Sequence, residues 1–185
     1  LRIILKILQA TTEVNHETLI VYDTDDDDSI PVVRNMQNSY PQLRLIHNRL
    51  GKGVVNAVKS GINAAKGRYI LIITADDIGP VLSIGDMVEL MEDGCELVSA
   101  TRYAYGGRIL GGKLISRMLS RISNKFFHTI SRSALTDSTI GIKMFKPSIF
   151  NKIKLEAKPI GWAFALELAI KAQLNGLRLG EVPII

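Results

Sequence analysis

The run Tyr69-Ile70-Leu71-Ile72-Ile73 lies between the turn Lys66-Gly67-Arg68 and the acidic pair Asp76-Asp77. Aliphatic, β-branched and aromatic residues without polar alternation are typical of a strand that is buried on both faces of a mostly parallel sheet. Open α/β sheets bind their ligands at the carboxyl ends of such strands. Two carboxylates at this edge therefore indicate a site for a divalent metal or for a phosphate-bearing substrate.

Strand-like and helix-like segments alternate on both sides of this run. The expected elements are strands at 18–22, 43–46 and 96–100 and helices at 30–38, 53–65 and 84–92. Residues 1–8 also have helical periodicity but no N-cap, so we expect the chain to begin inside a helix and to lack the strand before it. The βαβαβ order predicts a single α/β domain over residues 1–185, with a mostly parallel central sheet flanked by helices.

The composition limits the classes of partner. With 185 residues, of which 46% are hydrophobic and 22% charged, the chain is long enough for one domain with a sizeable core. A net charge of +5 favours an anionic partner, which would be nucleic acid, a phosphate-rich small molecule or an anionic bilayer. The single cysteine, Cys95, excludes an internal disulfide, and no stretch reaches the ~20 apolar residues of a membrane span.

A second acidic cluster runs from Asp23 to Asp28. Most runs of like charge are solvated loops, and several of these aspartates fit that description. Asp23 differs because it directly follows the strand expected at 18–22, which places it at the same sheet edge as Asp76. Two carboxylate clusters at one edge strengthen the prediction of a binding site there.

Further short motifs occur along nearly the whole chain. In order, the motifs are Asp23-x-Asp25, Gly53 to Gly61, Ala65 to Tyr69 with Thr74-Ala75-Asp76, Ser99 to Tyr103 with Gly106-Gly107, Thr136 to Phe145, Gly161-Trp162 to Glu167, and Gly180 to Pro183. In this order they resemble the family-2 inverting glycosyltransferases of the GT-A fold, most closely the dolichyl- or polyprenyl-phosphate sugar (mannose) synthases. The resemblance implies a domain that transfers a sugar from a nucleotide-sugar donor to a polyprenyl phosphate or another membrane-linked acceptor.

The resemblance implies a donor site for a UDP- or GDP-sugar. Asp23 and Asp25 match the acidic residues that contact the base and the ribose. Gly53 and Asn56 belong to the next segment of the donor site, and Asp76 lies at the diphosphate.

The resemblance also implies a metal cofactor, Mg²⁺ or Mn²⁺, that bridges the donor diphosphate. Asp76 matches the last carboxylate of the family's Asp-x-Asp motif. The first carboxylate of that motif is Thr74 here, so either the affinity for metal is lower or Asp77 substitutes as a ligand. Oxygen ligands of this kind suit a hard divalent cation.

The acceptor side of the implied site contains four residues. Arg102 matches an arginine that meets the acceptor's phosphate, and Lys143 replaces an arginine with a similar task. Asp137 matches the aspartate that orients or activates the acceptor. Glu167 matches a second acidic position, but it fits equally well on the polar face of a helix over 163–174.

The segment 113–131 has the pattern of a basic amphipathic helix. Its apolar positions recur every three or four residues, while Arg117, Arg121 and Lys125 form a separate ridge. Two interpretations remain open: the apolar stripe packs on the sheet, or the helix lies at an anionic membrane interface and presents the site to a lipid phosphate. The resemblance favours the second, with the protein peripheral at the cytoplasmic face of a membrane.

Other functions share parts of this pattern. A non-catalytic descendant that binds a nucleotide sugar or a membrane partner would be consistent with Thr74 and with Ala163 and Ala165, which replace polar residues of the family. A receiver-like phosphoryl-transfer domain would leave the segments around Arg102 and Asp137 unexplained. A nucleotidyltransferase would need a glycine-rich phosphate loop near its N-terminus. No nucleic-acid partner is expected.

Overall fold

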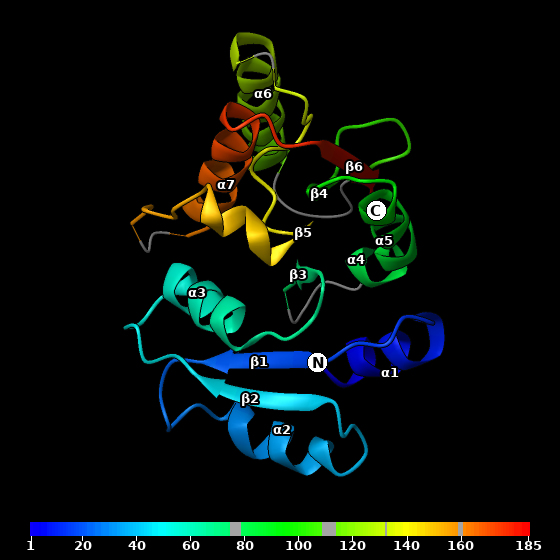
Figure 1. Ribbon diagram of the computed structural model, residues 1–185, viewed down its shortest axis with the longest axis vertical. Coiled ribbons are helices and arrows are strands. Elements are labelled where there is room, and N and C mark those ends of the chain that lie inside the picture. Colours follow the sequence, from blue (N-terminus) through cyan, green and yellow to red (C-terminus); the bar gives the residue numbers. More distant parts are fainter. Residues whose placement is uncertain (75–78, 109–113, 132, 159–160) are drawn as a thin grey trace.

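The computed structural model describes residues 1–74, 79–108, 114–131, 133–158 and 161–185. Helices and strands alternate along the chain (Figure 1). The elements are α1 (Arg2–Thr11), β1 (Thr18–Tyr22), α2 (Ser29–Gln37), β2 (Leu43–His47), α3 (Val54–Ala64), β3 (Ile70–Ile72), α4 (Gly79–Leu82), α5 (Ile84–Glu92), β4 (Leu97–Thr101), α6 (Leu114–Ser131), β5 (Lys143–Phe145), the 3₁₀ helix η1 (Pro147–Asn151), α7 (Ala163–Leu174) and β6 (Leu179–Pro183).

The described strands form two sheets. β1 and β2 are a parallel pair in which Tyr22 lies opposite His47. The second sheet has the order β3-β5-β4-β6, in which β4 and β6 are parallel and β5 is antiparallel to both β3 and β4. β3, β4 and β6 therefore point the same way, and β5 alone in this sheet is reversed. The prediction of a mostly parallel α/β arrangement flanked by helices is confirmed.

Like the short strand β5, β4 is buried on both faces. All five of its residues are buried. Val98 and Ala100 pack in a core with α1, α2 and α5, while Leu97 packs in a second core with Phe145 and α7. This alternation follows from the two-residue period of a strand whose two edges are both paired.

The run 69–73 does form a strand, but the prediction that it is buried on both faces was wrong. β3 is only three residues long, and each of them is partly exposed. In the described part of the chain β3 pairs with a single neighbour, β5. A strand at the edge of a ladder has one flank without a neighbouring strand, so its side chains keep contact with solvent.

Local signals predicted most of the other boundaries. The strand at 18–22 is β1, and the helices at 30–38, 53–65 and 84–92 are α2, α3 and α5. α3 packs on β1 at Gly61, where an added Cβ would lie 3.3 Å from Cγ2 of Val21. α6 confirms the helix expected at 113–131, although Lys113 itself lies outside the described residues. None of the described helices combines the length and the hydropathy needed to cross a bilayer.

Candidate functional site

Three strand ends and one loop meet at a single edge of the four-stranded sheet. β4 and β6 end there, and the reversed strand β5 begins there with Lys143, which lies opposite Ser99. The loop 136–142 leads into β5 at the same edge. The site is therefore built from segments that are far apart in the chain.

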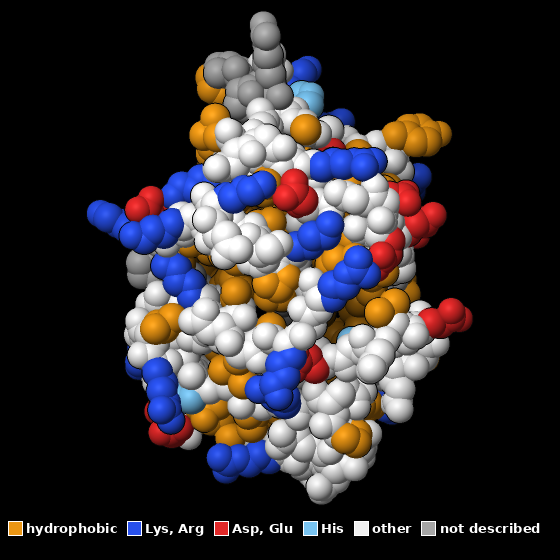
Figure 2. Space-filling model, viewed as in Figure 1, with side chains coloured by type: hydrophobic (Ala, Val, Ile, Leu, Met, Phe, Trp, Pro, Cys, Tyr) orange, Lys and Arg blue, Asp and Glu red, His pale blue; other side chains and the backbone are white. Residues whose placement is uncertain are grey.

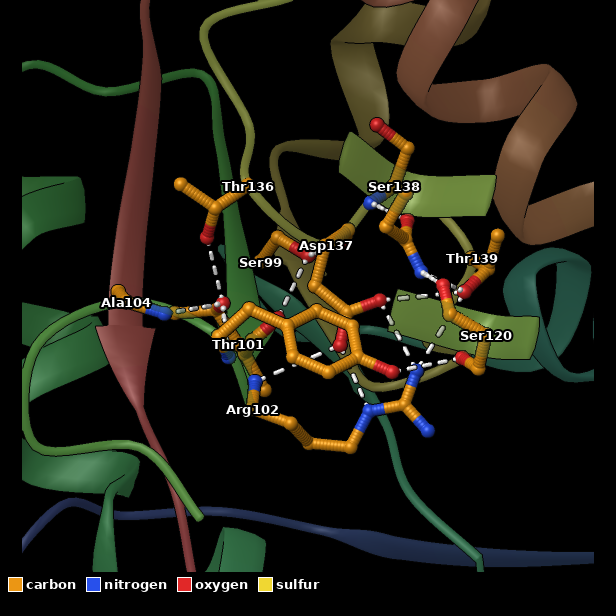
Figure 3. Close-up of polar contacts among 12 residues, drawn as sticks. Ser99, Thr101, Arg102, Ala104, Ser120, Thr136, Asp137, Ser138 and Thr139 are labelled. Carbon is orange, nitrogen blue, oxygen red and sulfur yellow. Dashed lines mark hydrogen bonds and ion pairs between the residues drawn. The ribbon is translucent and has the colours of Figure 1, made fainter. Parts of the chain in front are cut away.

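Asp137 and Arg102 form a two-pronged ion pair at this edge (Figure 3). Arg102 donates from Nε to Oδ2 of Asp137 at 2.7 Å and from Nη2 to Oδ1 at 3.0 Å. The Asp137 side chain is completely buried, whereas 27% of the Arg102 side chain is exposed. Burial disfavours the charged guanidinium, but the hydrogen bonds and the attraction of Asp137 outweigh it and raise the pKa of Arg102. The paired arginine is thus held in a fixed orientation, and its side chain stays partly exposed to solvent.

Lys143 lies beneath this ion pair and not in the open site. Its side chain is fully buried, and its Nζ donates to Oγ of Ser99 at 2.8 Å. Burial lowers the pKa of Lys143 to about 8, against the attraction of Asp137 and Glu181. The expectation that Lys143 contacts an acceptor phosphate is corrected here, because a fully buried ammonium cannot reach a ligand in solvent.

Glu181 on β6 holds the backbone that carries Asp137. Its Oε1 accepts the N–H of Thr136 at 2.7 Å and the N–H of Asp137 at 3.2 Å, and its Oε2 accepts the Thr136 hydroxyl at 2.9 Å. Burial raises the pKa of Glu181, although these hydrogen bonds oppose the shift. The sequence analysis gave Glu181 no role. The feature that could have identified it is a carboxylate inside the otherwise apolar segment 179–185.

Helix α6 is tied to the same loop. The buried amide of Asn124 donates to Oγ1 of Thr139 at 2.9 Å and accepts the N–H of Ser138 at 3.1 Å. Tyr103, which follows Arg102, donates its hydroxyl to Oγ of Ser120 at 2.7 Å (Figure 3). These hydrogen bonds connect α6 directly to the two residues that follow Asp137.

Asp23 lies at the carboxyl end of β1 and connects it to the start of α3. Its two oxygens accept Nδ2 of Asn48 at 2.7 Å and the N–H of Gly53 at 2.9 Å. These hydrogen bonds lower the pKa of Asp23. Gly53 begins α3 with a φ of 115°, in the left-handed region that favours glycine.

Of the other residues expected at the donor, Gly53 contacts Asp23, and Asp76 lies outside the described residues. Asp25 is exposed in the loop after β1. Asn56 lies beside the turn before α3, because a Cβ on Gly51 would be 3.4 Å from its Nδ2. The structure thus joins Asp23 with Gly53 and leaves Asp25 open to solvent.

Asn48 is a second residue without a role in the sequence analysis. It is buried at the end of β2, where it also donates to the carbonyl of Gly51 and accepts the N–H of Leu50 and the hydroxyl of Ser60. The signal that could have identified it is its position after a strand, at the same edge as Asp23.

Replacing the buried Asn48 with alanine is expected to lower the free energy of unfolding by about 3 kcal/mol, because the buried Ser60 and several partly buried groups lose their hydrogen bonds together. The measurement is urea unfolding of the variant and the wild type. Asn35→Ala, at an exposed position of α2, is the matched control and is expected to change stability by less than about 0.5 kcal/mol. Equal effects of the two substitutions would contradict the assigned role of Asn48.

Glu167 has its contacts elsewhere. On α7 it accepts the N–H of Glu156 at 2.7 Å and of Ala157 at 2.8 Å, and it pairs with Lys171 at 2.8 Å. None of these partners belongs to the cluster around Asp137. The structure therefore supports the alternative position of Glu167 on a polar helix face, where it fixes the segment before α7.

The carboxylates expected to bind metal, Asp76 and Asp77, lie outside the described residues. Thr74 is described and lies two residues beyond β3, partly buried. Within the ranges that the structure covers, no three acidic, histidine or cysteine side chains are grouped closely enough to hold a metal ion.

Solved structures with this arrangement include glycosyltransferases. Glucosyl-3-phosphoglycerate synthase from Mycobacterium tuberculosis in complex with UDP has a TM-score of 0.67 at 12% identity, over 97% of this chain and 63% of that one. A structure of the same synthase with Mn²⁺, UDP-glucose and glycerol 3-phosphate has a TM-score of 0.61 at 10% identity, over 97% and 73%. At this identity the likeness concerns the fold, which is the GT-A fold.

The sequence comparison is more specific than the fold. A family model described as Glycosyl transferase family 2 matches residues 1–155, and the chain belongs to this family. The dolichol-phosphate mannosyltransferase of Pyrococcus furiosus is 25% identical over 96% of this chain and 50% of its own length. Glycosyltransferase AglD of Haloferax volcanii is 25% identical over 91% of this chain and 27% of its own length. The chain thus spans half or less of these relatives.

Proposed function

We propose that this protein is an inverting glycosyltransferase that moves a sugar from a nucleotide-sugar donor to a phosphate group on a membrane lipid, such as a polyprenyl phosphate. The observation that carries the proposal is the guanidinium of Arg102, which two hydrogen bonds to Asp137 fix at the sheet edge on a partly exposed side chain. A planar, oriented guanidinium suits a phosphate oxyanion. The name of the archaeal dolichol-phosphate mannosyltransferase agrees with such an acceptor.

On the acceptor side the reaction needs orientation more than proton removal. A phosphate monoester is ionised near neutral pH, so its oxygen can attack the anomeric carbon directly while the bond to the nucleoside diphosphate breaks. Both oxygens of Asp137 are engaged by Arg102, which favours an orienting role for Asp137 over that of a general base. Displacement from the opposite face inverts the anomeric carbon.

On the donor side, we propose that Asp23 and Asn48 shape the entrance to α3 at the carboxyl ends of β1 and β2. Asp76 and Asp77 would hold Mg²⁺ or Mn²⁺, since carboxylate oxygens suit these hard cations. The bound ion would neutralise the charge that develops on the departing diphosphate.

We further propose that α6 docks on an anionic bilayer. The helix forms one end of the molecule (Figure 1), where hydrophobic and basic side chains share the surface (Figure 2). Its exposed apolar residues are Leu114, Ile115, Met118, Leu119, Ile122 and Phe126, each more than half exposed. Arg121 and Lys125 are also exposed on this helix. Exposure of the apolar stripe favours the membrane interpretation over packing on the sheet, and the basic residues suit anionic head groups.

The variant Leu119→Glu/Ile122→Glu is expected to bind vesicles containing phosphatidylserine about tenfold more weakly than the wild type, because each ~1.4 kcal/mol of lost apolar burial or added repulsion changes the affinity tenfold. Binding is measured by vesicle sedimentation. Leu82→Glu is the matched control, since Leu82 is 66% exposed on α4 and not on α6. If the double variant and the control bind equally well, α6 is not the docking surface.

A donor and acceptor screen tests the function itself. The purified full-length protein is incubated with UDP- and GDP-sugars, Mg²⁺ or Mn²⁺, and either polyprenyl phosphate in vesicles or a water-soluble phosphate monoester. Transfer to the lipid phosphate supports the proposal, and transfer only to the soluble phosphate rejects the lipid acceptor. Donor binding without any turnover would support the non-catalytic alternative, which Thr74 at the metal motif makes worth testing.

A further inference from the structure

The Arg102–Asp137 pair belongs to a cluster of four charged groups. They are Arg102 after β4, Asp137 in the loop before β5, Lys143 on β5 and Glu181 on β6. Asp137 and Lys143 are fully buried, and the other two are partly buried. The two positive charges balance the two negative ones. Such a balance is needed because an unpaired charge in a mostly buried cluster is unfavourable.

Lys143 does not stabilise the fold by itself. Its lowered pKa means that the protein interior opposes the charged ammonium more than Asp137 and Glu181 attract it. An apolar side chain of similar length at this position would avoid that opposition. Lys143 and Glu181 also lie in register on the two sides of Ser99, which pairs with Lys143 on β5 and with Glu181 on β6. This register places the ammonium of Lys143 where it can compensate its acidic neighbours.

Glu181 acts on Asp137 through the backbone. The N–H groups of Thr136 and Asp137 both point at one oxygen of Glu181, and the Thr136 hydroxyl contacts the other. Thr136 is in turn 2.7 Å from Thr101 on β4 through their hydroxyls (Figure 3). A carboxylate on a rigid strand thus sets where the peptide carrying Asp137 lies, and Asp137 sets where Arg102 lies.

We propose that Glu181 is a positioning residue of the acceptor site and that Lys143 is its buried counter-charge. The assignment of the site to the acceptor rests on the proposed function, while the charge coupling between Glu181 and Lys143 does not. The two parts are tested by separate experiments.

The coupling is tested by thermal unfolding of Glu181→Gln, Lys143→Met and the double variant. Glu181→Gln leaves two cations, the fully buried Lys143 and the partly buried Arg102, facing one carboxylate, so its Tm is expected to fall by roughly 5 °C. Adding Lys143→Met restores the charge balance and is expected to recover at least about half of that loss. If the decrease in Tm of the double variant equals the sum of the decreases in the two single variants, the proposal is overturned. This holds whether or not the protein is an active transferase.

The positioning role is tested by steady-state kinetics with the donor and acceptor varied separately. Glu181→Gln is expected to raise the acceptor KM about tenfold and to change the donor KM by less than about twofold. The double variant restores the charge balance but not the carboxylate, so its acceptor KM is expected to stay raised.

Glu17→Gln is the matched control. Glu17 also accepts a backbone N–H, from Lys66, and pairs with Arg44, but it lies at the amino end of β1. This variant is expected to leave both KM values within about twofold of the wild type. Equal changes in the donor and acceptor KM of Glu181→Gln would overturn the positioning role. A wild type that transfers no sugar would reject the proposed function, and the unfolding data would then decide on the coupling alone.

Discussion

Asp137→Ala is expected to abolish detectable transfer and to lower the Tm by roughly 10 °C. The substitution removes one partner of a buried ion pair and leaves the guanidinium of Arg102 without its two hydrogen bonds. Breaking such a pair costs about 3–5 kcal/mol, which for a chain of this size corresponds to a shift of that order. The measurements are a thermal melt and single-turnover transfer under conditions that give turnover for the wild type.

Two further variants separate stability from function at this pair. Arg102→Lys keeps the positive charge but loses the two-pronged geometry, so the acceptor KM is expected to rise while the Tm falls less than in Asp137→Ala. Asp93→Ala removes an exposed aspartate after α5 and serves as the control, with Tm and transfer unchanged. An Asp137→Ala protein that melts and transfers like the control would refute the assigned role of the pair.

Gly141→Ala is expected to cost about 2 kcal/mol or more and to displace Trp162. The ring of Trp162 lies on this glycine, and an added Cβ would be 2.3 Å from Cε3 and 2.5 Å from Cζ3. Such a contact forces the ring or the backbone to move, as in an overpacked core. Because Gly141 is two residues before Lys143, we also expect reduced transfer. Tryptophan fluorescence reports the displaced ring directly, since Trp162 is the single tryptophan of the chain.

Gly85→Ala is the same chemical change, but it is expected to raise the stability and not to lower it. Gly85 lies in α5, and among the described residues no atom outside its own helix backbone and chain neighbours lies within 4 Å of an added Cβ. Alanine at a helical position without a steric clash is expected to raise stability by about 0.5–1 kcal/mol. If both variants are equally destabilised, the contact between Gly141 and Trp162 is not the cause.

Local patterns predicted the elements whose signals are contained in a few residues. The apolar run at 18–22 and the helical spacing at 53–65 and 113–131 each identified the observed element to within a residue or two. β5 and β6 were not predicted, because a three-residue strand such as 143–145 carries no recognisable period. The prediction that the run 69–73 is buried on both faces was also wrong, since the burial of a strand depends on which strands pair with it.

Part of the site could be predicted from the sequence, because some of its residues lie in short local motifs. Arg102 and Asp137 were identified through the motifs that contain them, and the structure brings them into direct contact although 35 positions separate them. Asn48 and Glu181 were missed because their importance lies in partners that are distant in the chain. Asn48 donates to Asp23, and Glu181 accepts the N–H groups of Thr136 and Asp137. Lys143 was given a ligand contact, but its place on the reversed strand β5 buries it beneath Asp137.

The sequence by itself determined the family, the α/β class and the residue types available at the strand ends, since each of these depends on local order and spacing. Only the tertiary structure decided that the apolar run 69–73 is a partly exposed edge strand and that β4 and β5 are the buried strands. It also decided that Arg102, Asp137, Lys143 and Glu181 form a single balanced cluster. The physical reason is that burial and charge compensation are properties of neighbours in space, which strand pairing sets and which residue order alone does not specify.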